Sequence, residues 1–124
     1  MKKSAMNTSK SYRDLEVWRL SMQLVERTYY HTAHFPSNEI YGLTSQLKRS
    51  CISISANIAE GKGRQSKGEF RQFLNIARGS AAETMSHLET ALMLGFLNKE
   101  NYETLFEIAD RISAMLYKLI ITLR

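Results

Sequence analysis

Cysteine, proline and long apolar runs are scarce or missing in this chain of 124 residues. The single cysteine, Cys51, excludes an internal disulfide framework and is typical of a reducing compartment. No apolar stretch approaches the length of a membrane span, and the N-terminal lysines precede no apolar run like that of a signal peptide. These absences predict a soluble, cytoplasmic protein with no membrane partner.

The scarcity of proline favours long helices, because proline removes a backbone donor and clashes with the preceding helical turn. Apolar residues recur at steps of three and four, which is helical spacing, and no strand-like alternation competes with it. Turn signals at residues 35–38, 61–66 and 95–98 divide the pattern into four segments. We predict an all-α fold, an antiparallel up-down-up-down four-helix bundle over residues 12–124, after a flexible basic tail at residues 1–11.

Capping residues predict where two of the helices begin. Ser11 with Asp14 three residues later resembles a capping box and would open the first helix. Ser66 with Glu69 has the same spacing and would open the third helix.

Glycines predict where helices end. The second helix is expected at about residues 39–60, where Gly61 and Gly63 follow, because glycine adopts the left-handed conformation that closes many helices. The third helix is expected at residues 67–94, and the fourth from residue 98 or 99 to the C-terminus.

Each predicted helix carries an apolar stripe for a common core. In the first two helices these stripes comprise Leu15, Trp18, Met22, Val25 and Tyr29, then Ile40, Leu43, Leu47, Cys51, Ile54 and Ile58. Other apolar residues fall outside the stripes of their helices and predict contact with another subunit of a cyclic oligomer. These residues are Val17, Leu20, Leu24, Ile76 and Leu94.

Positive charge is unevenly distributed in a chain whose formal net charge is +5. The first cluster comprises Lys2, Lys3, Lys10 and Arg13. The second cluster comprises Lys48, Arg49, Lys62, Arg64, Lys67, Arg71 and Arg78. Clustered basic residues attract nucleic acid or another anionic partner, and the alternative is a face that only keeps the protein in solution.

The glycine-rich stretch at residues 61–68 resembles a phosphate-binding loop only superficially. It follows a helix, whereas a phosphate loop follows a strand, and it lacks the required Gly-Lys-Ser/Thr order. We expect a helical turn, whose cations and the N-terminus of the next helix could act together on one anion.

Residues for catalysis or metal binding are not arranged in a recognisable pattern. Glu83 and His87 form the one nearby carboxylate–histidine pair, without the second copy that a metal-binding bundle uses. Cys51 and the serines show no paired base in sequence. We expect no metal, no cofactor and no enzymatic activity.

Asn57 and Glu60 flank a predicted core position on the second helix, with Arg49 about two turns earlier on nearly the same face. A buried or interfacial polar cluster of this kind can fix the register between helices. A position on the surface is an equally good interpretation.

One block of sequence resembles a known family. Residues 53–61 read Ser-Ile-Ser-Ala-Asn-Ile-Ala-Glu-Gly, with Gly63-Arg64 behind them, Tyr41-Gly42-Leu43 before them and Gly79-Ser80-Ala81-Ala82-Glu83 after them. This pattern is similar to the four-helix-bundle proteins encoded in intervening sequences of 23S ribosomal RNA genes. The similarity covers residues 12–124, and Ser55 departs from it because the family often has proline there.

The resemblance implies a four-helix bundle that assembles as a homopentameric ring. It also implies kinship with accessory proteins of diversity-generating retroelements, which are basic pentamers that bind nucleic acid and a reverse transcriptase. Together with the charge pattern, it predicts a non-enzymatic oligomeric scaffold that binds RNA or DNA through a repeated basic patch. The alternative is a scaffold that binds an acidic partner protein and has no nucleic-acid role.

Overall fold

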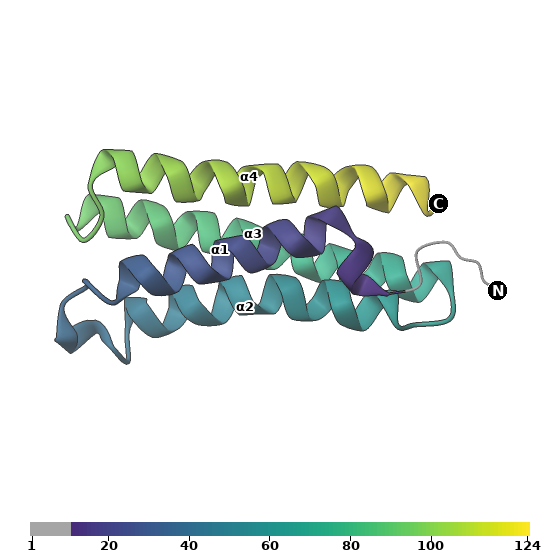
Figure 1. Cartoon of the computed structure of the whole chain (residues 1–124), viewed down its shortest axis with the longest axis horizontal. Helices are drawn as coiled ribbons and strands as arrows, with labels where there is room; N and C mark the ends of the chain where they lie inside the picture. Colours follow the sequence, from purple (N-terminus) through teal and green to yellow (C-terminus); the bar gives the residue numbers. More distant parts are fainter. Residues whose placement is uncertain (1–10) are drawn as a thin grey trace.

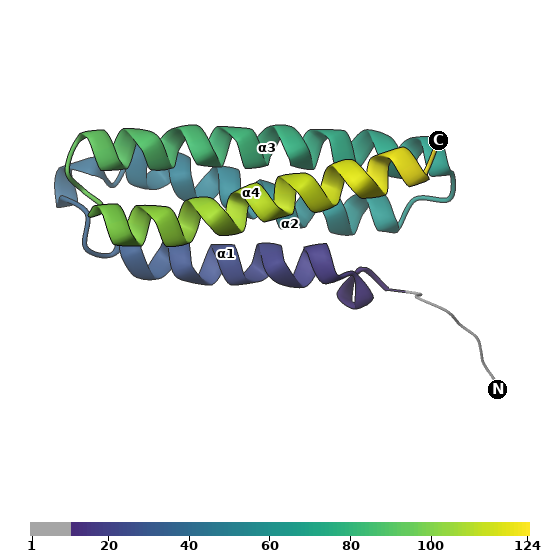
Figure 2. The same cartoon turned by 90° about the horizontal axis from the view of Figure 1, so that it is seen from above.

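The structure, a computed structural model, describes residues 11–124. Four α-helices lie side by side along one long direction (Figures 1 and 2): α1 Glu16–Thr32, α2 Leu43–Lys62, α3 Lys67–Met93 and α4 Lys99–Thr122. Two short 3-10 helices, η1 (Tyr12–Asp14) and η2 (Ser37–Glu39), precede α1 and α2. The described residues contain no strand, which confirms the prediction of an all-α, four-helix fold.

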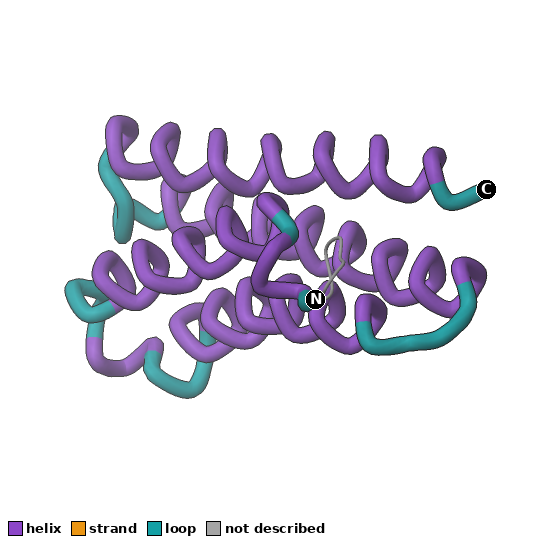
Figure 3. Tube along the Cα trace, turned by 45° about the vertical axis from the view of Figure 1, so that its right-hand side comes forward, coloured by secondary structure: helices purple, strands orange, loops and turns teal. Residues whose placement is uncertain are grey.

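Each helix packs against two others, in the order α1, α2, α3, α4 and back to α1. The α1–α2 and α3–α4 connections lie at one end of the bundle, and the α2–α3 connection and the C-terminus lie at the other (Figures 1 and 3). The rings of Phe35 and Phe96, with centroids 5.5 Å apart, join the two connections at the first end. The cations of the α2–α3 connection are therefore separated from these two connections by the length of the bundle.

The start of α1 differs from the prediction. The Ser11 hydroxyl accepts a hydrogen bond from the Arg13 backbone N–H at 3.1 Å and caps η1 rather than a long helix. Leu15 then has an extended conformation, with φ −79° and ψ 124°, so α1 begins at Glu16. The predicted flexible tail, with Lys2, Lys3 and Lys10, lies outside the described residues except for Ser11.

The buried face of α1 is also different from the predicted one. It is formed by Val17, Ser21, Leu24, Thr28 and Thr32. Met22 and Tyr29, which were predicted in the core, are 41% and 42% exposed. Val17 and Leu24 are 5% and 0% exposed, so their predicted placement on an outward stripe is wrong. The reason is that Ser21 donates its hydroxyl to a carbonyl of its own helix at 2.6 Å, which lets a polar residue occupy a core position.

The start of α2 lies four residues beyond its predicted position. The chain at residues 37–39 forms η2, and Ile40, which was predicted in the core, is 57% exposed. The Glu39 carboxylate then accepts a hydrogen bond from the Leu43 backbone N–H at 3.0 Å. Glu39 therefore supports the first turn of α2 instead of belonging to it.

Gly61 is a point of close approach between α2 and α3. A Cβ atom at this position would lie 2.7 Å from Phe73 Cβ and 3.0 Å from Phe70 Cδ1. Gly61 is buried inside α2, and Gly63 has φ −80°, so neither residue adopts the left-handed conformation that was predicted for them. Gly95, with φ 80°, adopts it after α3.

Pairs of hydroxyl groups join α2 and α3 along the rest of their contact. Ser53 Oγ lies 2.9 Å from Ser80 Oγ, and the Thr84 hydroxyl donates to Ser50 Oγ at 2.8 Å. Residue numbers rise along α2 as they fall along α3, so the two helices are antiparallel. Because both partners are small, the backbones can approach closely while the buried polar groups remain satisfied.

The predicted cap of α3 is confirmed, and α4 begins within its predicted range at a cap that the structure adds. The Ser66 hydroxyl accepts from the Glu69 backbone N–H at 3.1 Å, and α3 begins at Lys67. Asn98 Oδ1 accepts from the Asn101 backbone N–H at 2.7 Å, and α4 begins at Lys99. Both helices thus begin where side-chain acceptors replace missing backbone partners.

Replacing Gly61 with alanine should destabilise the bundle by about 1–3 kcal/mol, because the new methyl group would force α2 and α3 apart. Gly79→Ala is the matched control, since a Cβ there meets nothing within 4 Å. We expect Gly79→Ala to stabilise α3 by about 0.5–1 kcal/mol. Urea unfolding followed by circular dichroism measures both, and equal stabilities of Gly61→Ala and the wild type would contradict this packing.

Cys51 should be chemically inert in the folded protein. Its side chain is fully buried, its thiol donates to the Lys48 carbonyl at 3.3 Å, and burial raises the pKa of Cys51 to about 11. Thiolate, the reactive form, is therefore scarce at mildly alkaline pH. Labelling with a disulfide reagent should be slow in buffer and fast in urea, and rapid labelling of the folded chain would show that the core opens at α2.

Candidate nucleic-acid interface

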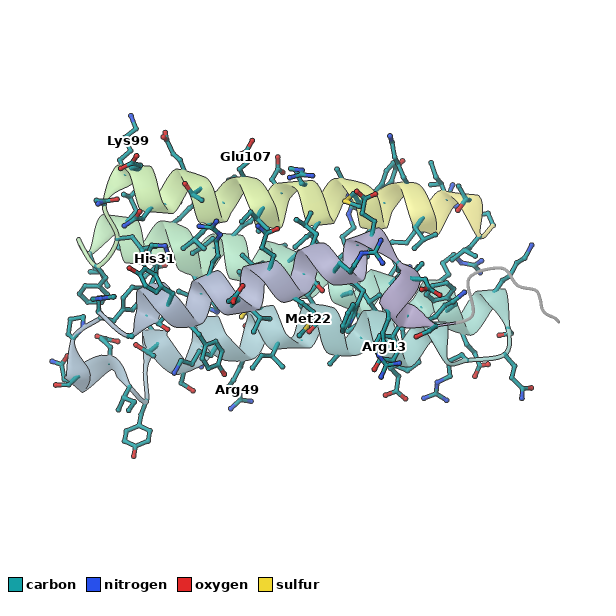
Figure 4. The ribbon with its side chains drawn as sticks, viewed as in Figure 1. Arg13, Met22, His31, Arg49, Lys99 and Glu107 are labelled. Atoms are coloured by element: carbon teal, nitrogen blue, oxygen red, sulfur yellow. The ribbon has the colours of Figure 1, made fainter. Side chains whose placement is uncertain are left out.

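The predicted cations do not form one continuous patch, because they project from several faces of the bundle. Lys48 lies over the Tyr29 ring, 4.5 Å from its centroid, and so faces α1. Arg49 projects outward from α2 (Figure 4) and shares a hollow of about 210 Å³ with Glu83 of α3. These two cations are separate from those near the α2–α3 connection, so the structure divides the predicted site.

Two cations of the α2–α3 connection lie over phenylalanine rings of α3. Lys62 Nζ is 5.8 Å from the Phe70 ring centroid, and the Arg64 guanidinium is 4.8 Å from the centroid of Phe73. Arg64 also donates to Glu60 at 2.7 Å in an exposed ion pair. An exposed pair of this kind contributes little to stability, so Arg64 remains able to exchange its partner.

The expected contribution of the α3 N-terminus to anion binding is not supported by its local structure. The Ser66 hydroxyl donates to the Glu69 carboxylate at 3.2 Å, which places that carboxylate in the first turn of α3. A negative side chain already interacts favourably with the positive end of the helix dipole there. An approaching anion would meet the Glu69 charge, so the side-chain cations must supply the attraction.

Arg71 and Arg78 reach from α3 toward α4. Arg71 Nη1 donates to the Leu123 carbonyl at 2.8 Å, and the Arg78 guanidinium lies 4.9 Å from the centroid of the Tyr117 ring. A hollow of about 290 Å³ lies beside them. Its lining residues are Asn75, Arg78, Gly79, Ala82 and Ser113. We call the surface formed by these lining residues with Lys67, Arg71 and Tyr117 the α3–α4 groove.

Tyr117 and Ser113 did not emerge as site residues from the sequence. The apolar periodicity of α4 identifies its core face, but it does not identify which helix lies beside each flank of that face. Tyr117 is 47% exposed although its ring is aromatic. In the sequence, the one sign of a site was that Tyr117 is an aromatic residue outside the core stripe of α4. The proximity of Tyr117 to Arg78 depends on the packing of α4 against α3.

The predicted polar cluster of α2 is divided between two environments. Asn57 Nδ2 donates to the Ser53 carbonyl at 2.8 Å and lies 3.0 Å from the Ser53 hydroxyl, beside the hydroxyl pairs that join α2 to α3. Glu60 is exposed and pairs with Arg64. Asn57 therefore belongs to the helix interface, whereas Glu60 is a surface residue.

A hollow of about 540 Å³ lies between α1 and α4. Its lining includes Arg27, Tyr30 and His31. Partial burial, followed by the charges of Arg27 and His34, lowers the pKa of His31, so its neutral form is favoured near neutral pH. The hydroxyl groups in this lining belong to Tyr30 and Thr104.

Residues that could bind a metal ion are dispersed over the described part of the chain. Residues 11–124 contain no group of three or more His, Cys, Asp or Glu side chains able to hold an ion. Glu83 and His87, the pair considered from the sequence, are 3.3 Å apart on α3. Their contact is a hydrogen bond within one helix.

The predicted interface residues fall into two groups. Val17 and Leu24 are core residues, and Leu20 is partly buried against the core. Ile76 and Leu94 are 47% and 50% exposed, as expected for residues outside the core.

None of the helices between residues 11 and 124 combines the length and hydropathy needed to cross a membrane.

Comparisons with known proteins place this architecture in a family. The sequence profile of the family described as "23S rRNA-intervening sequence protein" matches residues 13–118, from η1 into the last turns of α4. This match confirms the resemblance inferred from residues 53–61 and their neighbours. No protein of curated function matches the chain.

A solved crystal structure supports the same relationship. It is that of a protein of unknown function from the S23 ribosomal protein family, from Bacteroides thetaiotaomicron. Sequence identity is 29%, the TM-score is 0.76, and the match covers 84% of this chain and 97% of that one. With the family profile covering most of the sequence and the fold shared over nearly all of the solved structure, this chain belongs to the family of 23S rRNA-intervening sequence proteins.

Proposed function

We propose that this protein is a non-enzymatic, cytoplasmic scaffold, an up-down-up-down bundle that assembles as a cyclic homo-oligomer and binds RNA. The binding surface is formed by the cations near the α2–α3 connection and along the adjoining half of α3. These cations are Lys62, Arg64, Lys67, Arg71 and Arg78. We call them the basic end.

The observation that carries this proposal is the excess of positive charge at the basic end, where residues 60–78 contain five cations and two carboxylates, Glu60 and Glu69. Among the described residues, Arg64 is the one cation of this set with a carboxylate within ion-pair distance. Positive charge that is not neutralised internally attracts polyanions and releases their counterions on binding. Lys67 is exposed on the same stretch of α3 as Arg71 and Arg78, which lets one backbone reach more than one of them.

The aromatic supports of the basic end favour binding without a large ordering cost. The side chains of Lys62, Arg64 and Arg78 each lie over a ring, at 5.8, 4.8 and 4.9 Å from its centroid. Contacts of this kind hold the cation in one region while leaving its N–H groups available. Fewer rotamers are then lost when a phosphate binds.

Replacing Lys62, Lys67, Arg71 and Arg78 together with glutamine should weaken binding to a structured RNA by well over tenfold at low salt. The reason is that the phosphate contacts supply most of the attraction. The slope of log K against log salt should become shallower by roughly 0.7–0.9 for each phosphate that the variant no longer neutralises. Fluorescence anisotropy of a labelled RNA hairpin over a series of salt concentrations measures both quantities.

The matched control removes the same charge elsewhere, with Arg27, Lys99, Arg111 and Lys118 replaced by glutamine. All four are exposed, and Lys99 lies at the opposite end of the bundle (Figure 4). The control variant should retain most of the affinity. Equal losses in the two variants would mean that net charge alone attracts RNA.

If the wild type binds no RNA at low salt, the basic end instead fits the alternative, a scaffold for an acidic partner protein.

Assembly of several copies would strengthen weak contacts at the basic end through multivalency, because one RNA could contact several subunits. The family resemblance suggests five subunits in a closed ring. Ile76 and Leu94 support a subunit interface by their exposure, and Ile52 adds a 41% exposed side chain on α2. Burying each of these residues would contribute roughly 1.5–3 kcal/mol.

Replacing Ile52 and Ile76 with glutamate should release smaller species in light scattering, because charged side chains oppose burial in an apolar contact. Ala114→Glu, on the exposed face of α4, is the control for a new surface charge. Circular dichroism should stay helical in both variants. Leu24→Glu is unsuitable because Leu24 is fully buried within one chain. A wild-type monomer at micromolar concentration would refute the ring.

A further inference from the structure

We propose that the α3–α4 groove binds single-stranded RNA, with one base stacked on Tyr117 and the adjoining phosphates held by Lys67, Arg71 and Arg78. The inference rests on the proposed RNA-binding function and identifies the form of RNA. It adds a stacking surface and hydrogen-bonding groups to a site that sequence reasoning described by charge alone.

Tyr117 supplies the stacking surface. Its ring lies beside the Arg78 guanidinium at 4.9 Å, and 47% of the side chain remains exposed. A guanidinium on one side fixes the ring position and leaves the rest of the ring available for a second flat group. Stacking of bases on aromatic side chains adds to the phosphate contacts in many single-strand binders, and it tolerates every base.

A hollow lined by Arg78 and Ser113, one helical turn along α4 from Tyr117, provides room for a base. Gly79 and Ala82 line its floor, and an added Cβ at Gly79 would meet nothing within 4 Å. The volume of about 290 Å³ is open to solvent along the groove. Small side chains on α3 thus leave this space open beside Arg78.

Polar groups in the hollow suit the edge of a base or a 2′-hydroxyl. Asn75 Nδ2 donates to the Arg71 carbonyl at 3.1 Å, which orients the amide and leaves its oxygen as an acceptor. Ser113 adds a hydroxyl from α4, which can donate or accept. No carboxylate lines this hollow.

The cations lie along one side of the groove at steps of four and seven residues. The rise of an α-helix places Lys67 about 6 Å from Arg71, and Arg71 about 10 Å from Arg78, along α3. Arg71 uses one N–H for the Leu123 carbonyl and keeps its other donors. A phosphate backbone that follows α3 can therefore contact successive cations while its bases turn toward Tyr117.

The shape of the groove selects a single strand. The space between two packed helices, whose axes are about 8–10 Å apart, is too narrow for a duplex. In a duplex the bases are also stacked on one another, so none is available to Tyr117. A duplex can contact the cations at the surface but gains nothing from the ring.

Tyr117→Ala tests the stacking contact. Binding of a fluorescein-labelled oligoadenylate should weaken by roughly 5- to 100-fold, the usual loss when a stacking side chain is removed. Binding of an RNA duplex with the same number of phosphates should change less than about twofold, since the cations remain. Tyr117→Phe should restore oligoadenylate binding because it keeps the ring.

Tyr29→Ala is the matched control. Tyr29 is a tyrosine of similar exposure, 42%, with Lys48 over its ring at 4.5 Å, but it lies on α1 away from the groove. Its replacement should leave oligoadenylate binding unchanged. Equal losses in Tyr29→Ala and Tyr117→Ala would overturn the assignment of the site.

Gly79→Leu tests the hollow without weakening the fold. The open space around Gly79 accommodates the side chain, and leucine favours helix over glycine. Stability should rise while oligoadenylate binding falls to the level of Tyr117→Ala. Unchanged binding would exclude the hollow, and a change in oligomer size would show that the groove is a subunit contact, which also overturns the proposal.

The outcomes separate this inference from the function on which it rests. If the wild type binds neither oligoadenylate nor duplex, the RNA-binding function itself is wrong. If it binds both, and only the loss of the basic-end cations weakens them, RNA binding stands and the stacking contact is refuted.

Discussion

The close packing of α2 against α3 is the constraint on which the other features of this bundle depend. Gly61 allows it, because any side chain at that position would collide with Phe73 and Phe70. The same approach brings Ser53 within 2.9 Å of Ser80, so hydroxyl groups can satisfy one another inside the interface. A larger separation would break this contact and leave the Ser80 hydroxyl without it, which is costly in a buried interface.

This packing also determines where the positive charge lies. The α2–α3 connection is short, so Lys62 and Arg64 remain beside the first turns of α3 and lie over its phenylalanine rings. Arg71 and Arg78 extend from the opposite flank of α3 to α4. The basic end therefore wraps around α3. It begins at the α2–α3 connection, at the opposite end of the bundle from the α1–α2 and α3–α4 connections (Figure 1), and extends into the first half of α3.

Much of the helical architecture follows from local chemistry. Ser66 predicts the start of α3 because a side-chain acceptor at that position replaces a missing backbone partner, and Asn98 has the same role at the start of α4 in the structure. Gly95 predicts the end of α3 because it adopts a positive φ. The start of α2 is less predictable. Glu39 was expected to be its first residue, but it lies before the helix and accepts a hydrogen bond from the Leu43 backbone N–H.

The sequence by itself determined the number of helices, their approximate extents and the family, because periodicity, capping and the Asn-Ile-Ala-Glu-Gly motif are local properties of the chain. The tertiary structure decided which face of α1 is buried, since Ser21 and Thr28 enter the core beside Val17 and Leu24. It also decided that Gly61 serves close packing and that Arg78 meets Tyr117. The physical reason is that these features depend on distances between helices, and hydropathy along one helix contains no information about its neighbours.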